Sequence, residues 1–425
     1  MMLYDVVVVG GGTAGVIAAV QAGREHARTL LIEKSEILGG TIVNGRVAFP
    51  GLFHAWKKQI IGGIGWELVC KSMDEENRPY PDVSTQVRRP HNIHQIAING
   101  PYYALICDEA VAEAGVEVLF DTMCAKVVEL EDRKVITVCT KTGLQEIETK
   151  VLIDCTGDAN VASLAGYELL REDEFQPATY SCKLEGYDVD SLDLERIGEN
   201  FDREVQAGNL SYTDVSWTID RFNPQWLRAK GANGNHVDVE GCRGRTSEER
   251  SAISLKARLT ILKLLRFFRK QSGLEHIRLD ALAAECGIRE TVRIKGKKMV
   301  TQEQYLSGER YGDDLCYSFY PIDLHTKVKN GLSQIYLEEG VVPTIPRGGL
   351  LPEHSRNFLV AGRCISSDRA ANSALRVQAT CMAVGQAAGA IAALAAKQNV
   401  DVEEVPMEDI YEVLRRHRAI VPSEQ

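Results

Sequence analysis

The sequence lacks the cysteine spacing that would indicate a disulfide-stapled or zinc-binding protein. Its 11 cysteines are scattered from Cys70 to Cys381, and none of them forms a C-x-x-C pair. An odd number of unclustered cysteines is typical of reduced thiols. The sequence therefore predicts neither a disulfide framework nor a metal site.

An excess of positive charge is also missing. The net charge is −10 over 425 residues, whereas unspecific binding to nucleic acid or to anionic membranes favours a basic surface. The N-terminus carries Asp5 and goes directly into a strand pattern, with no charged leader and separate apolar core, so a signal peptide is not expected. The longest apolar stretch, 379–396, is rich in alanine and glycine and barely long enough to cross a membrane, which predicts a buried helix. We expect a cytoplasmic protein that acts on a small molecule, without nucleic-acid or membrane partners.

What the sequence does have is a β-α-β pattern at its start. An apolar, β-branched run at 3–9 is bounded by glycine, as in a strand buried on both faces. Small residues at 13–23 predict a helix, and "TLLIEKS" (29–35) predicts a second buried strand. These three segments have the size of one β-α-β unit.

The turn after the first strand carries the spacing G-x-G-x-x-G. Gly10 permits the tight turn, Gly12 permits close approach of a pyrophosphate, and Gly15 permits close packing of the helix on the sheet. Glu33 ends the second strand, where a carboxylate can bind the hydroxyls of a ribose and disfavours a 2′-phosphate. The turn therefore predicts dinucleotide binding, and the alternative is a glycine-rich turn in another α/β protein.

The rest of the chain predicts a fold that returns to this first unit at its far end. Alternating runs at 124–153 predict a β-meander that leads into "KVLIDCTGD" (150–158), and "RNFLVAGRC" (356–364) predicts a late buried strand. The segment between 166 and 345 is more charged and contains a long helical pattern at 247–271. We predict a discontinuous dinucleotide-binding domain, 1–50 plus 100–165 plus 345–425, and a mixed α+β substrate or cap domain, 51–99 and 166–344.

This order of elements resembles the α/β, Rossmann-like FAD-binding fold of the glutathione-reductase type. In that fold a strand ending in Thr-Gly follows the meander, and a late strand ending in glycine precedes a C-terminal helix that points at the flavin. Two segments, 287–325 and "VAGRCISSDRAANSALRVQATCMAVGQAAG" (360–389), further resemble a largely uncharacterised bacterial family of FAD-dependent oxidoreductases. The resemblance spans nearly the whole chain and implies bound FAD and redox activity. No second G-x-G-x-x-G is evident for a nicotinamide nucleotide.

The resemblance and the motifs together predict the residues that bind FAD. These are Gly10, Gly12, Thr13, Ala14, Gly15, Glu33, Lys34, Gly40, Thr41, Cys124, Thr156, Gly157, Asp158, Gly362, Arg363, Leu375 and Arg376. One departure stands out: the late strand ends in Gly362-Arg363, where much of the wider superfamily has Gly-Asp with the aspartate on the ribityl chain. Asp368 follows five residues later, so the ribityl partner stays open.

The catalytic candidates lie near the predicted flavin-facing helix. Arg376 precedes that helix and could clamp an anionic substrate group or polarise the flavin, or it could serve a structural ion pair. Asp323 and His325 lie on one side of an extended segment, and histidine is a natural general base. Arg347, in "IPRGG", is a further candidate, and a structural role is the alternative for all four residues.

These features predict two-electron, hydride-type oxidation or reduction of a small organic substrate at flavin N5. Oxygen, a quinone or another protein could be the electron partner, and a homo-oligomer is left open. His54, His91 and His94 could supply a covalent link to the flavin. Two alternatives remain: a binding protein without turnover, as in the Rab escort and GDI proteins of this architecture, and a flavin-dependent RNA-modifying enzyme.

Overall fold

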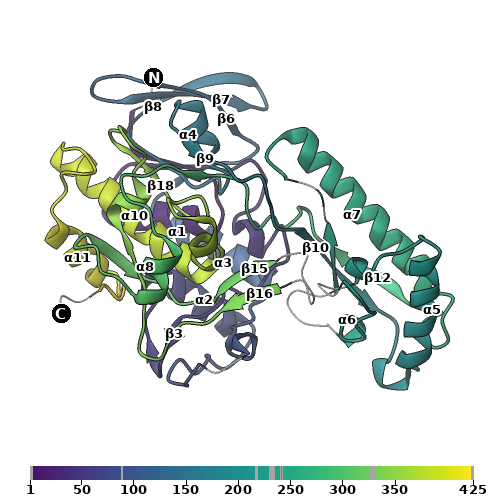
Figure 1. Cartoon of the computed structure of the whole chain (residues 1–425). Helices are drawn as coiled ribbons and strands as arrows, with labels where there is room; N and C mark the ends of the chain where they lie inside the picture. Colours follow the sequence, from purple (N-terminus) through teal and green to yellow (C-terminus); the bar gives the residue numbers. More distant parts are fainter. Residues whose placement is uncertain are drawn as a thin grey trace.

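The structure is a computed structural model that describes residues 3–422, apart from 88–89, 216–218, 229–234, 240, 242 and 326–331. It has a main body that contains both ends of the described chain. A lobe built from the middle of the sequence projects to one side (Figure 1). The main body holds the elements that sequence patterns assign to the dinucleotide site.

The predicted β-α-β unit forms β1 (Leu3–Val9), α1 (Thr13–Arg24) and β2 (Thr29–Ile32). Strand β1 lies inside a seven-stranded sheet of order β5-β2-β1-β8-β7-β6, with β18 also paired to β8. The β1–β2 and β1–β8 pairs are parallel, and the inner residues of β1 are fully buried. Burial on both faces explains why the strand reads as a continuous valine run.

Strand β8 (Gly143–Asp154) belongs to two arrangements. Its first half pairs antiparallel with β7 (Lys134–Thr140), which pairs with β6 (Met123–Glu129), so the predicted meander is confirmed. Its last residues pair in parallel with β1 and with β18 (Phe358–Val360). The carboxyl ends of β1, β8 and β18 therefore meet at one edge of the sheet, which is where open α/β sheets bind ligands.

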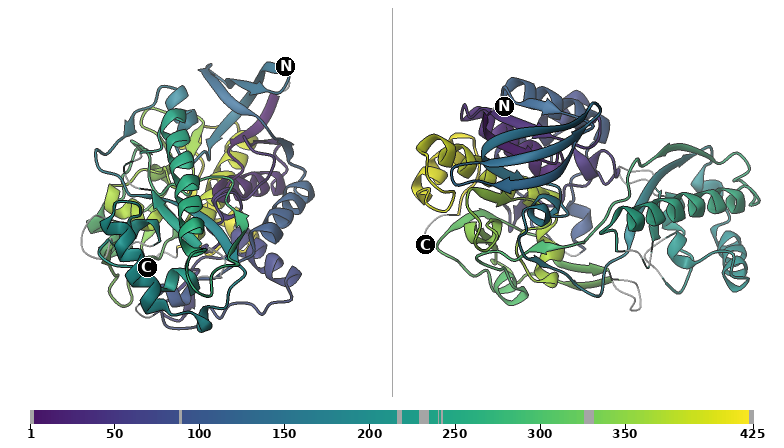
Figure 2. Two further views of the ribbon diagram at one scale, coloured as in Figure 1. Left: turned by 90° about the vertical axis from the view of Figure 1, so that its right-hand side faces the viewer. Right: turned by 90° about the horizontal axis from the view of Figure 1, so that it is seen from above.

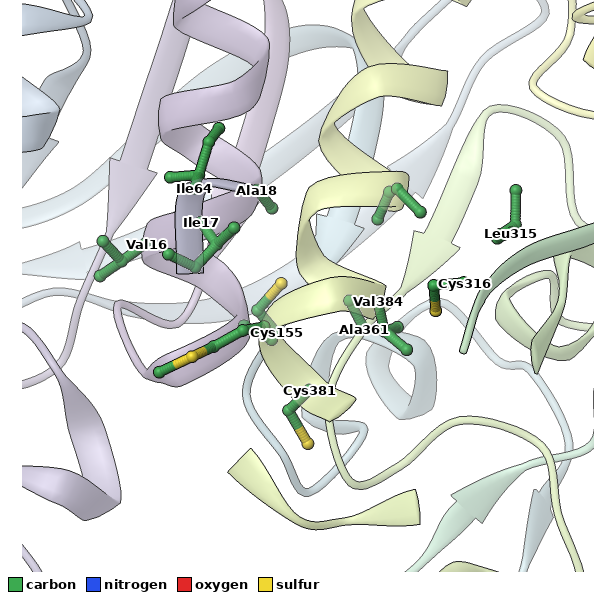
Figure 3. Packing of buried hydrophobic residues seen from close by; sticks show 14 of the residues in the cluster. Val16, Ile17, Ala18, Ile64, Cys155, Leu315, Cys316, Ala361, Cys381 and Val384 are labelled. Carbon is green, nitrogen blue, oxygen red and sulfur yellow. The ribbon is translucent and has the colours of Figure 1, made fainter. Parts of the chain in front are cut away.

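Helix α10 (Gln378–Gln398) packs along α1, and glycines make the close approach possible. A Cβ atom on Gly385 would lie 2.2 Å from the Ala14 carbonyl oxygen, and one on Gly389 would lie 2.3 Å from that of Ala18. Figure 3 shows the two helices side by side, with Ile17 and Val384 among the buried side chains of this core. Of the described helices, α10 is long and apolar enough to cross a membrane, but 89% of its most apolar stretch is buried inside the protein. The prediction of a buried helix is confirmed.

The projecting lobe has a hydrophobic core of its own, drawn from residues 178–288. Its sheet consists of β10 (Ala178–Glu185), β11 (Asn235–Val239) and β12 (Arg278–Leu282). The long helix α7 (Ser247–Phe268) and α5 (Leu194–Gln206) accompany this sheet, and Figure 2 shows the lobe extending away from the main body.

The stretch 46–101, which appears irregular in sequence, contains helix α2 (Gly63–Glu75) and leads into α3 (Gly100–Glu113). Buried residues from 52–73 and from 300–345 pack into the same core as α1 and α10. The division into two domains at the predicted boundaries stays a prediction.

The remaining elements are β3 (His54–Ala55), β4 (Lys58–Gln59), β5 (Glu117–Leu119), α4 (Asn160–Leu164), β9 (Leu169–Leu170), α6 (Gln225–Arg228), β13 (Arg293–Ile294), α8 (Gln302–Ser307), β14 (Asp314–Tyr317), β15 (Ile322–His325), β16 (Leu332–Ile335), β17 (Thr344–Pro346), α9 (Arg369–Leu375) and α11 (Met407–Arg416).

Candidate active site

The turn between β1 and α1 requires glycine at two of its three motif positions. Gly10 has a φ of 105°, and a Cβ atom there would lie 2.6 Å from the Cys155 carbonyl oxygen. A Cβ atom on Gly15 would lie 1.8 Å from the Gly10 carbonyl oxygen. These short distances show that the turn, the first turn of α1 and the end of β8 are packed too closely for a side chain at either position.

Gly12 lies beside open space, unlike Gly10 and Gly15. A Cβ atom there would meet only the Cα atom of Gly40, at 3.8 Å. Gly12 is the N-cap of α1 and offers no side chain to the first N–H groups of the helix, which include those of Thr13 and Ala14. Gly40 lies against this helix start and begins a short 3₁₀ turn that includes Thr41. We call Gly10–Gly15 and Gly40–Thr41 the cradle. Free N–H groups and a positive helix end fit a pyrophosphate.

Glu33 lies at the edge of the cradle with 6% of its surface exposed. One carboxylate oxygen accepts the Gly11 N–H at 2.6 Å, and the other accepts the backbone N–H and hydroxyl of Ser35. The Thr122 N–H donates to the Glu33 carbonyl, so the start of β6, with Cys124 as its second residue, lies near Glu33. The oxygen that accepts the Gly11 N–H keeps one lone pair for a further donor, as a ribose hydroxyl would require.

The neighbouring Lys34 points away from Glu33. Its ammonium group forms an exposed ion pair with Glu285 at 2.7 Å. This contact links the segment after β2 to the last part of the projecting lobe, after β12.

The loop after β8 is tied to the loop after β18 by an ion pair. Arg363, which follows Gly362, donates to Asp158 at 2.5 Å and to the Gly157 carbonyl at 2.7 Å. Asp158 also accepts from Arg250 of α7 at 2.7 Å. Burial alone would raise the Asp158 pKa, but the two guanidinium groups lower it below its usual range. Because Arg363 and Asp158 neutralise each other, the Gly-Arg departure from the wider superfamily has a structural reason in this chain.

Thr156 belongs to the same loop, and its N–H and hydroxyl both donate to buried Asp154. The backbone of Gly362 lies against α1, since a Cβ atom there would be 3.5 Å from that of Ala14. The predicted residues of the β1–α1 turn and of the loops after β8 and β18 therefore meet at the N-terminal start of α1.

Five polar side chains lie beside the start of α10, and we call them the α10 cluster: Gln176, Glu290, Asp323, His325 and Arg376. Arg376 donates to the side-chain oxygen of Gln176 at 3.1 Å and to the backbone carbonyl of Asp323 at 3.3 Å. The same Gln176 oxygen accepts the backbone N–H of His325 at 3.0 Å, and the Gln176 amide donates to Glu290 at 3.0 Å. The cluster thus joins four segments that are far apart in sequence.

Burial and neighbouring charges set the protonation states of the cluster. Burial, together with repulsion from Arg289, lowers the pKa of Arg376 to about 10, so its guanidinium stays charged at neutral pH. The same two causes lower the pKa of His325 to about 3, although Asp323 lies 3.7 Å away and opposes the shift. Burial alone would raise the Asp323 pKa, but His325 and Arg376 hold it below its usual range. At neutral pH the cluster therefore holds a cationic Arg376, an anionic Asp323 and a neutral His325.

The predicted candidates are brought together only in part. Asp323, His325 and Arg376 share the cluster, and buried Leu375 precedes Arg376. Arg347 donates instead to the Val405 carbonyl at 2.6 Å, near α11. Arg289 and Glu290 do not pair with each other. Glu290 binds Arg369 and Gln176, while Arg289 donates to the Pro177 carbonyl.

Sequence reasoning missed Gln176, which connects the cluster. It stands in "EFQPATY", and nothing in that segment distinguishes it from a surface loop. Its 4% exposure and its three bonded neighbours become apparent only in the folded chain.

A Rossmann-like sheet, a free helix N-terminus and a meander define the class of dinucleotide-binding α/β proteins. Within that class, the chain matches the family described as FAD dependent oxidoreductase over residues 5–415, and it belongs to this family. The predicted FAD-binding fold is confirmed, and the protein is an FAD-dependent enzyme.

Curated relatives match only short segments. Dihydrolipoyl dehydrogenase from Trypanosoma brucei brucei is 47% identical over 53 residues, 12% of this chain and 11% of that protein. Nicotine dehydrogenase from Pseudomonas putida is 41% identical over 73 residues, 15% of each chain. The matched segments thus span only a small part of these relatives' own length.

Solved structures are similar over more of the chain but at low identity. A geranylgeranyl bacteriochlorophyll reductase-like protein from Thermoplasma acidophilum is 13% identical, with a TM-score of 0.46 over 98% of this chain and 84% of that one. OxyS anhydrotetracycline hydroxylase from Streptomyces rimosus is 13% identical, with a TM-score of 0.45 over 98% of this chain and 66% of that one.

The cradle fits the cofactor that the family requires. The space at Gly12, the uncapped start of α1 and the buried carboxylate of Glu33 suit the pyrophosphate and ribose of FAD. Because the protein is an enzyme, the alternative of a binding protein without turnover is set aside. The individual cofactor-binding residues, the RNA-modifying alternative and the oligomeric state stay predictions.

Proposed function

We propose that this enzyme oxidises or reduces a small organic molecule by two-electron transfer beside the start of α10. The observation that supports this is the α10 cluster, a buried and charged network placed directly before the helix. Bound FAD supplies a hydride acceptor or donor at N5. The residues of the chain orient the substrate and handle the accompanying proton.

Arg376 is the proposed orienting residue. Its three hydrogen bonds, to the Ser373 carbonyl, to Gln176 and to the Asp323 carbonyl, fix the guanidinium in one position. The positive end of α10 adds to its charge, since the N-cap Val377 supplies no side-chain acceptor. Together they stabilise negative charge that develops at this place during reduction.

His325 is the proposed proton-handling residue, with Asp323 as its positioning partner. Because its pKa is about 3, the imidazole is neutral at physiological pH and can accept a hydrogen bond from a hydroxyl or an amine. A base with so low a pKa holds a transferred proton only weakly, so we expect the proton to pass on to solvent.

A substrate panel tests this proposal. Purified protein should be yellow, and under anaerobic conditions its flavin absorbance should bleach with a small organic substrate or be restored by one after photoreduction. Arg376→Lys keeps the charge but cannot make all three hydrogen bonds, so it should slow the flavin reaction by at least about tenfold. Arg24→Lys, which changes an arginine paired with Glu67, is the matched control and should react like wild type.

Two results would contradict the proposal. One is a flavin that neither bleaches nor recovers with any member of a broad panel while an electron-donating protein or nucleotide reduces it. The other is an Arg376→Lys variant that reacts as fast as the Arg24→Lys control.

A further inference from the structure

A cavity of about 340 Å³ lies outside the cradle and next to the α10 cluster. Its volume is in the range of small-molecule binding sites. Most of the described residues of its wall are apolar: Leu52, Trp56, Val87, Phe319, Pro321 and Leu337. The Trp56 and Phe319 rings meet edge to face with centroids 5.1 Å apart, which presents a rigid aromatic surface.

The wall of this cavity continues into the loop that covers the start of α10. Leu52 follows Pro50 and Gly51, and the Pro50 carbonyl accepts the Ala379 N–H of α10 at 2.7 Å. A Cβ atom on Gly51 would lie 2.3 Å from the Val377 side chain, so the loop and the helix start are in direct contact. The cavity is therefore adjacent to the place where the proposed reaction occurs.

Two polar residues of the wall connect the cavity to the cluster. His91 lies 2.8 Å from the Tyr320 hydroxyl and 3.4 Å from the Tyr336 hydroxyl. Tyr336 donates to Gln334, which in turn donates to Asp323 at 3.1 Å. A hydrogen-bonding group of a ligand in the cavity would therefore meet a chain of groups that ends in the α10 cluster.

The described residues of the cavity wall carry negative charge. Glu338 and Glu339 line it, both are exposed, and neither forms an ion pair with a described residue. Among the described residues that line the cavity, none is a lysine or an arginine. Arg376, the cation of the α10 cluster, does not line the cavity and donates to Gln176 and to backbone carbonyls.

We propose that this cavity is the substrate site and that it selects a small amine with an apolar, aromatic-sized body. This inference rests on the proposed function, because it names the substrate class for the same reaction. The apolar wall binds the body of the ligand, the two carboxylates attract its ammonium group, and a carboxylate substrate is disfavoured.

Three probes with one body and different charges test the selection: 2-phenylethylamine, 2-phenylethanol and phenylacetate. Their dissociation constants are measured by calorimetry on the FAD-loaded enzyme, kept anaerobic and photoreduced so that no oxidation of the probe contributes heat. We expect the amine to bind at least about fivefold more tightly than the alcohol, and the alcohol more tightly than the acid, as one charge pair in water-like surroundings would give.

The carboxylates are tested by the double variant Glu338→Gln with Glu339→Gln. It should weaken amine binding to about the level of the alcohol and leave alcohol binding within about twofold. The matched control, Glu146→Gln with Glu275→Gln, removes the same charge at exposed positions outside the cavity wall and should leave the amine preference intact. Equal binding of all three probes, tightest binding of the acid, no binding of any probe, or a double variant that keeps the preference would overturn the proposal.

The oxidised enzyme separates this inference from the function on which it rests. If the amine binds with the predicted preference but never bleaches the flavin, the proposed reaction fails and the amine-selective cavity stands. If a substrate bleaches the flavin while the Glu338/Glu339 variant changes neither binding nor bleaching, the cavity assignment fails and the reaction stands.

Discussion

The cradle and the α10 cluster lie at the starts of two adjacent helices, yet they are built from different materials. The cradle is almost entirely backbone, with glycines that bring Gly10, Gly15 and the end of β8 into contact. The α10 cluster is made of side chains from four separate segments, joined by hydrogen bonds to Gln176. One region binds by shape and by free N–H groups, whereas the other acts through charge.

This difference implies two kinds of sensitivity. In the close-packed glycine regions, an added methyl group has no space, so the expected damage is steric and affects the whole fold. In the cluster, most substitutions fit, but they leave buried polar groups without partners and shift their protonation. The close-packed glycine regions should therefore tolerate added atoms poorly. The cluster should tolerate changes in size, and changes in its polar groups should affect the flavin reaction and the pH dependence.

The largest expected effect comes from the contact between α1 and α10. Gly385→Val would place side-chain atoms against the Ala14 carbonyl, where even a Cβ atom would lie at 2.2 Å. We expect a loss of at least about 3 kcal/mol in unfolding free energy, or failure to fold. Chemical denaturation measures it, with Ala383→Val at a half-buried position of the same helix as control. Equal stability of the two variants would show that the helices can separate without cost.

Gln176→Leu is expected to have the next largest effect. The variant removes the acceptor of Arg376 and His325 and the donor to Glu290, all buried, which should lower the unfolding free energy by about 2–4 kcal/mol. Reduction of the flavin should slow, while FAD affinity should change little. Gln398→Leu, at the exposed end of α10, serves as the control. Wild-type stability in Gln176→Leu would mean that the cluster is not a connected network.

The protonation of His325 should appear in the pH dependence of stability. Its pKa is about 3 in the folded chain and about 6.5 when unfolded, so the unfolded state takes up a proton first as pH falls. The stabilisation by the neutral imidazole is complete above about pH 6.5 and is lost progressively toward pH 3. Between pH 7 and 5, wild type should lose about 2 kcal/mol more than His325→Gln.

Denaturation at both pH values measures this difference. The exposed His276→Gln variant is the control and should follow wild type. If His325→Gln loses as much stability as wild type over this range, His325 is not a buried neutral histidine.

The smallest effect is expected at Arg347. Its guanidinium donates to the Val405 carbonyl, so Arg347→Gln should cost about 1 kcal/mol of stability and leave the rate of flavin reduction within about twofold of wild type. Anaerobic stopped-flow reduction measures the rate. A tenfold slower reaction would instead support the catalytic role that the sequence predicts for this residue.

The sequence was most informative where function depends on backbone geometry. The spacing of Gly10, Gly12 and Gly15, the acid at Glu33 and the alternating runs of the meander follow from local rules, and they predicted the fold. Gly385 and Gly389, which permit the close packing of α10 on α1, likewise act through backbone geometry. Such features are properties of short segments, and short segments can be interpreted without knowing what surrounds them.

The α10 cluster was less accessible from sequence. Asp323, His325 and Arg376 stood out because their residue types suit proton transfer and anion binding. Gln176 did not stand out, because a glutamine in a polar segment becomes important only through its distant partners. The low pKa of His325 likewise depends on burial and on Arg289, which no local pattern reveals. Helix α2 was missed because its many polar and glycine residues hide the face that packs into the main core.

Titration of the FAD-free protein with FAD tests the central division between cradle and cluster most directly. Gly12→Val should lower FAD affinity by at least about 100-fold without loss of apoprotein stability, because its side chain enters the open space that fits the pyrophosphate. Arg376→Lys should bind FAD within about threefold of wild type, because its role lies in the reaction. Normal FAD binding by Gly12→Val, together with loss of binding in Arg376→Lys, would contradict the account.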